Sequence, residues 1–87
     1  MYLHLGKGTV IDEREIIGIF DLDITSQSHI TRQYLTMSEK SGIVINAAED
    51  IPKSFVLSGK KGRENVYFTQ LSVSSLEGRW KRKNAHL

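Results

Sequence analysis

The sequence predicts an α+β fold with a small mixed or antiparallel β-sheet, and two observations lead to this prediction. Short runs of β-branched and aromatic residues recur along the chain, whereas only one long central stretch has a helical pattern. With 87 residues the chain has room for one domain, residues 1–87. One main helix can cover one face of such a sheet, so we expect a partner subunit to cover the other face or an edge.

The first half of the chain contains three predicted strands, at residues 2–5, 9–11 and 16–20. Gly6-Lys7-Gly8 forms the turn between the first two strands. The apolar run at 16–20 is typical of a strand that is covered on both faces. These features predict a short hairpin followed by a buried strand.

The main helix is predicted over residues 26–41. Either Ser26 or Ser28 can cap its start, because a hydroxyl oxygen accepts a hydrogen bond from a free amide of the first turn. Gly42 ends it. Its apolar stripe has helical spacing and consists of Ile30, Tyr34 and Met37.

The second half predicts three further strands, at residues 43–45, 54–58 and 65–71. The last two are joined by the basic tip 59–64. Ser74 and Glu77 have capping-box spacing, which predicts a short C-terminal helix. The predicted order is therefore β-β-β-α-β-β-β-α.

Charge is distributed unevenly along the chain, although the net charge is only +2. Residues 1–50 hold four basic and eight acidic side chains, whereas residues 51–87 hold eight basic side chains against Glu64 and Glu77. A basic half of this kind points towards a polyanion such as DNA. The candidate DNA-binding residues are these eight cations: Lys53, Lys60, Lys61, Arg63, Arg79, Lys81, Arg82 and Lys83.

An alternative interpretation of the same charges stays open. The tip 59–64 can be an ordinary solvated turn, and residues 79–87 can be a disordered basic tail that aids solubility. Against this, glycines in the tip let backbone amides approach phosphates closely, and three cations can reach them. We therefore favour function for the tip and for Lys53, and leave the tail open.

Catalysis has little support in the sequence. There is no cysteine, and His4, His29 and His86 are not spaced as metal ligands. Asp21 and Asp23 lie on one side of an extended chain but follow a strand directly, where charged residues are ordinary. Neither glycine–lysine cluster has the spacing of a phosphate-binding loop. We expect no enzyme, no cofactor or metal and no small-molecule substrate.

We expect the protein to act in the cytoplasm and not in a membrane. No apolar run approaches the roughly 20 residues that a membrane helix needs. The first six residues lack the basic start and the long apolar stretch of a secretion signal.

Four segments in order resemble one family: YLHLG at 2–6, IIGIFD at 16–21, PKSFV at 52–56 and YFTQLS at 67–72. Together they are similar to the extracellular-matrix regulators of the RemA/RemB family, most closely to its RemB branch. The resemblance spans nearly the whole chain. It implies a cytoplasmic transcriptional regulator of biofilm-matrix genes with a LytTR-like core. It also implies a homo-oligomer, in RemA-type members a ring, that presents basic residues to DNA.

Two departures from the family pattern concern the DNA site and the assembly. RemA-type proteins carry paired arginines before the fifth strand, where this chain offers only Lys53. They also have an arginine tied to assembly before the third strand, where this chain has Glu15. These departures keep a second hypothesis open, in which the protein regulates through a protein partner without touching DNA.

Overall fold

The computed structural model describes residues 2–60 and 62–84, with side chains through residue 80. The strands are β1 (Tyr2–Gly6), β2 (Thr9–Asp12), β3 (Ile16–Asp21), β4 (Val44–Asn46), β5 (Ser54–Lys60) and β6 (Arg63–Thr69). The helices are the 3-10 turn η1 (Glu13–Glu15), the short α1 (Leu22–Thr25), α2 (His29–Lys40) and α3 (Val73–Asn84). The α+β class is confirmed.

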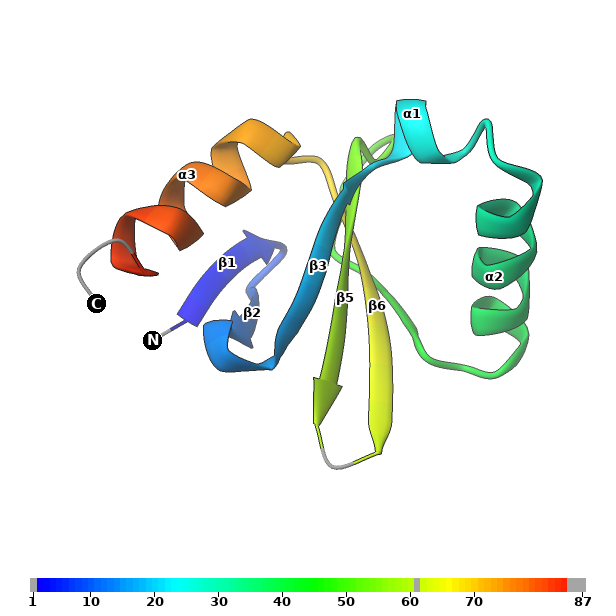
Figure 1. The fold of residues 1–87 in the computed structure, drawn as a ribbon, viewed down its shortest axis with the longest axis horizontal. Coiled ribbons are helices and arrows are strands. Elements are labelled where there is room, and N and C mark those ends of the chain that lie inside the picture. The colour runs from blue at the N-terminus through cyan, green and yellow to red at the C-terminus, as the bar shows by residue number, and fades with distance from the viewer. Residues whose placement is uncertain (1, 61, 85–87) are drawn as a thin grey trace.

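The strands form two sheets (Figure 1). β1 and β2 make an antiparallel hairpin, and the other strands form a four-stranded sheet in the order β3-β5-β6-β4. In the larger sheet β3 and β5 pair antiparallel to their neighbours, whereas β4 runs parallel to β6. The sheet is therefore mixed, which is one of the two arrangements, mixed or antiparallel, that the sequence left open.

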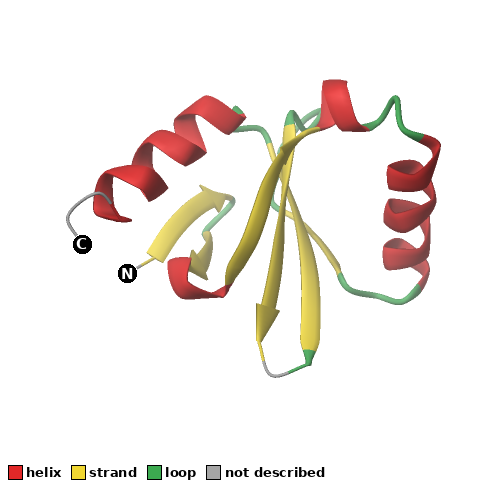
Figure 2. Ribbon diagram, in the orientation of Figure 1, coloured by secondary structure: helices red, strands yellow, loops and turns green. Residues whose placement is uncertain are grey.

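Helices lie on both sides of the larger sheet (Figure 2). The β1–β2 hairpin and α3 cover one face, and α2 lies over the other (Figure 1). The main core belongs to the first of these faces, because β1 alternates and turns Leu3 and Leu5 inward. Its buried members are Leu3, Leu5, Ile11, Ala47, Val56 and Leu76.

The main core lies under α3 and the β1–β2 hairpin, whereas α2, the predicted main helix, covers the other face of the sheet. The short helix α3 supplies Leu76, which is fully buried, whereas no residue of α2 belongs to the core cluster. In α2 the side chains of Ile30 and Met37 are 77% and 66% exposed. Apolar spacing predicted the helix correctly but could not show that only Tyr34 of the stripe is partly buried.

An aromatic layer lies between the sheet and α2. Phe20 and Phe55 stack with their centroids 4.9 Å apart, and Phe68 meets Phe55 edge to face at 6.4 Å. The hydroxyl of Tyr34 donates to the Glu64 carboxylate across 3.3 Å, and burial is the main cause that raises the pKa of this tyrosine. This contact joins α2 to β6.

Local capping explains where the helices begin. Ser28 caps α2 by accepting a hydrogen bond from the amide of Thr31. Of the two predicted capping residues, Ser26 and Ser28, the second is therefore the correct one. The predicted capping box of α3 is shifted, because the hydroxyl of Ser72 accepts from the amide of Ser75 at 3.2 Å. The helix continues through residues 79–84, so the basic segment is helical that far.

Candidate nucleic-acid interface

Lys53 has a fixed backbone and an exposed side chain. Its amide donates to the carbonyl of Thr69 and its carbonyl accepts from the amide of Leu22, each at 2.9 Å. The chain is therefore held between the end of β6 and the start of α1. The side chain lies in solvent, where an ammonium group can meet a phosphate at little desolvation cost.

A second group of cations lies at the turn that joins β5 and β6, which we call the tip. Lys60 and Arg63 face each other as the last pair of the β5–β6 ladder, and both are exposed. Lys61, also predicted to contact DNA, lies outside the described residues. The tip projects past the start of β3 (Figure 1), so a large ligand can reach it.

The structure does not bring Lys53 and the tip together. They lie at opposite ends of β5, and seven residues of extended chain span about 23 Å. One phosphate group cannot contact both of them. The sequence grouped these cations by their position in the chain, whereas the sheet separates them in space.

The third predicted basic group begins at Arg79 on α3. Arg79, His4 and Lys7 line a hollow of about 280 Å³ together with Gln70 and Leu71, which follow β6. Lys53 is bonded through its backbone to Thr69, the residue before Gln70, but it is not among the residues that line the hollow. We use the name loop-end cluster for Lys7 and Arg79, which line the hollow, together with Lys53, whose backbone lies beside Thr69. Glu49 also lines the hollow and offsets part of its positive charge.

The other basic residues of α3 have a defined backbone only. Residues 81–84 continue the helix, so Lys81, Arg82 and Lys83 follow Arg79 on one continuous element. Their side chains lie outside the described part of the structure. Their predicted contact with DNA stays a prediction.

Sequence reasoning missed Lys7, because it lies in the acidic half of the chain. The available signal was its position between Gly6 and Gly8 in a tight turn, where Lys7 has a φ of 50°. A turn presents its central side chain to solvent. Lys7 and Arg79 are 72 positions apart in the sequence, and only the folded structure shows that they line the same hollow.

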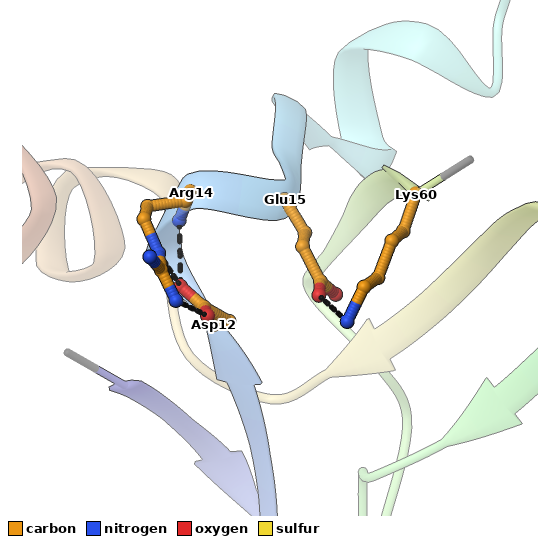
Figure 3. Close-up of polar contacts among 4 residues, drawn as sticks. All are labelled: Asp12, Arg14, Glu15 and Lys60. Carbon is orange, nitrogen blue, oxygen red and sulfur yellow. Dashed lines mark hydrogen bonds and ion pairs between the residues drawn. The ribbon is translucent and has the colours of Figure 1, made fainter.

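Sequence reasoning also missed the role of Glu15 beside the tip (Figure 3). A carboxylate oxygen of Glu15 lies 3.4 Å from the ammonium nitrogen of Lys60. The two residues line a hollow of about 500 Å³ with Arg63, Ser58 and Asn65. The tip is therefore partly neutralised by η1, which a count of charges along the chain could not show.

A neighbouring ion pair offsets the charge of Arg14, which lines a hollow with Lys60 (Figure 3). Its guanidinium donates to both carboxylate oxygens of Asp12, at 3.2 and 2.8 Å, and its amide donates to the same carboxylate at 3.0 Å. The side-chain hydrogen bonds from Arg14, followed by the backbone one, hold the pKa of the Asp12 carboxyl well below its usual range. Asp12 in turn raises the pKa of Arg14.

Within residues 2–60 and 62–84, no helix has both the length and the apolar character needed to span a bilayer. The described candidate cations fall into two groups, the tip with Lys60 and Arg63, and the loop-end cluster with Lys7, Lys53 and Arg79. Both consist of exposed cations and neutral hydrogen-bond donors beside a few carboxylates.

Comparison with known proteins gives the chain its relatives. No family model matches it. The chain is 34% identical over 79 residues to extracellular matrix regulatory protein B of Bacillus subtilis (strain 168), a match that covers 91% of this chain and 89% of that protein. At this identity and coverage, the chain belongs to the family of extracellular matrix regulatory protein B.

Proposed function

We propose that the protein is a cytoplasmic regulator of extracellular-matrix genes that binds DNA through phosphate contacts as a homo-oligomer. Its relative is named as a regulatory protein of the extracellular matrix. The observation that carries the DNA-binding part is that Lys7 and Arg79 line one hollow, while Lys53, at the family position, is exposed and bonded through its backbone to Thr69, just before the segment 70–71 of that hollow. The proposal includes no catalytic step and no cofactor.

A few phosphate contacts per protomer give weak binding, and an oligomer raises the overall affinity. Three cations that each neutralise one phosphate give a slope of about −2.7 in a plot of log affinity against log salt. Affinity then falls about 40-fold per protomer between 50 and 200 mM salt. Protomers that engage one duplex together bind much more tightly than a single one, because later contacts are intramolecular.

The test is fluorescence anisotropy of a labelled 30-base-pair duplex at these two salt concentrations. Lys53→Ala should weaken binding and reduce the salt slope by about one contact, or roughly 0.9. Lys40→Ala, an exposed lysine on α2, is the matched control and should change neither. Binding that is insensitive to salt, or absent at 50 mM, would overturn the proposal.

The predicted contribution of the tip is tested separately with Lys60, Lys61 and Arg63 changed to Ala. We expect weaker binding and an unchanged thermal midpoint, because Lys60 and Arg63 are exposed. An unchanged affinity would leave the loop-end cluster as the DNA surface. The mass in solution tests the oligomer, and a mass of about 10 kDa at working concentration would contradict it.

The second candidate function, regulation through a protein partner, is favoured by an exposed apolar surface on α1 and α2. Ile24, Ile30 and Met37 are 70%, 77% and 66% exposed. Ile30 borders a hollow of about 390 Å³ whose walls include Phe20 and Phe55. Exposed apolar surface of this kind is typical of protein contacts. A variant with Ile30→Ser that keeps full DNA affinity but loses regulation in cells would favour this candidate.

A further inference from the structure

An acidic residue, Glu15, lies beside the tip, where it can compete with a phosphate for Lys60. Glu15 ends η1, and its side chain points towards Lys60 and away from Arg14 (Figure 3). The two groups come from residues 45 positions apart, so tertiary packing alone brings them together. The oxygen–nitrogen distance is 3.4 Å. Among the described residues, Glu15 is the one acidic group that forms an ion pair with Lys60.

The hollow around this ion pair is suited to an anion. Lys60 and Arg63 contribute two cations, and Ser58 and Asn65 contribute neutral hydrogen-bonding groups from the same strands. Carboxylates and phosphates use the same donors, because both present oxygen atoms with negative charge. Within the lining, Glu15 is the group that already pairs with one of the two cations, Lys60, as a phosphate would.

The neighbouring carboxylate of Asp12 is not available to pair with Lys60. It is held by three hydrogen bonds from Arg14, of 2.8 to 3.2 Å, and these fix its position. Glu15 is held less firmly, since its contact with Lys60 is a single one of 3.4 Å, longer than each of the three that hold Asp12. An exposed pair of this kind separates at small cost, so an incoming phosphate can displace the carboxylate.

We propose that Glu15 is an internal competitor of DNA at the tip, a carboxylate that occupies Lys60 until a backbone phosphate displaces it. Glu15 therefore sets the affinity of the tip without contacting DNA favourably itself. This inference rests on the proposed DNA-binding function. Glu15 would lower the affinity for DNA because it occupies Lys60.

The experiment measures duplex binding by the full chain with Glu15→Gln, which keeps the size of the side chain and removes its charge. We expect affinity for the 30-base-pair duplex at 50 mM salt to rise about two- to fivefold, as loss of an exposed ion-pair competitor implies. The salt slope should stay the same, because a phosphate contacts Lys60 in both complexes and only the carboxylate that it must displace is removed.

Two further variants separate the proposed route from a general charge effect. Glu39→Gln on α2 changes the net charge equally and should raise affinity less than Glu15→Gln does. The double variant Glu15→Gln with Lys60→Ala should show no gain over Lys60→Ala alone, because the cation that Glu15 occupies is absent. Equal thermal midpoints of the single variants show that folding is unchanged.

The outcomes distinguish this inference from the function on which it rests. If the unmodified protein binds the duplex and Glu15→Gln matches Glu39→Gln, the competitor role is wrong and the proposed function stands. If the gain persists without Lys60, the route through Lys60 is wrong. If neither the unmodified protein nor Glu15→Gln binds at 50 mM salt, both the inference and the proposed function are overturned.

Discussion

Thr69 joins the two sheets, and its replacement by valine tests how much this connection contributes. The side chain is fully buried at the end of β6. Its hydroxyl donates to the carbonyl of Leu5 in β1 at 2.6 Å and accepts from the amide of Leu71 at 3.2 Å. Thr69→Val keeps the shape of the side chain and removes both hydrogen bonds.

The expected loss follows from the groups that remain unpaired. A buried donor or acceptor without a partner costs about 1–3 kcal/mol. Leu5 is 1% exposed, so its carbonyl cannot recover a bond to water. Leu71 is only partly buried, and its amide recovers part of the cost. We therefore expect Thr69→Val to lower the free energy of unfolding by about 2–4 kcal/mol.

Thr69→Ser is the matched control, because it keeps the hydroxyl and loses one methyl group. This change should cost only about 1 kcal/mol. Urea unfolding followed by circular dichroism, at one fixed protein concentration, gives both values. A loss for Thr69→Val that is equal to or smaller than the loss for Thr69→Ser would refute the importance of these hydrogen bonds.

Three further predictions concern the core, one turn and one ion pair. Leu76→Ala removes a fully buried side chain of α3 and should lower the free energy of unfolding by about 2–5 kcal/mol in the same urea titration. A loss below about 1 kcal/mol would contradict the placement of α3. Gly6→Ala should lower the thermal midpoint, because its Cβ would lie 2.6 Å from a carbonyl oxygen at a φ of +119°, whereas Gly78→Ala in open helix should not. In an NMR titration the Asp12 carboxyl should show a pKa below the usual aspartate value. The stability that this ion pair contributes is present above the ordinary aspartate pKa and is lost as the pH falls through the lowered value. Arg14→Ala should raise the pKa of Asp12, and an unchanged pKa would contradict the ion pair.

The sequence by itself determined the elements and most of their order, because these depend on neighbouring residues. β-branched runs formed the strands, and Ser28 capped α2 at one of the two predicted positions. The family could also be predicted, from four short segments whose succession is specific, and comparison confirmed it. Lys53 lies exposed before β5, and the DNA contact that the family pattern implies for it stays a prediction.

Only the tertiary structure decided which surfaces these elements share. Periodicity shows that a helix has an apolar stripe but not what covers it, and so α3 and the β1–β2 hairpin bury the main core while the stripe of α2 stays largely exposed. Charge along the chain likewise grouped Lys53 with Lys60, whereas β5 holds them at its two ends. The pairing of Lys60 with Glu15 joins residues 45 positions apart, and such contacts follow from packing rather than from local sequence.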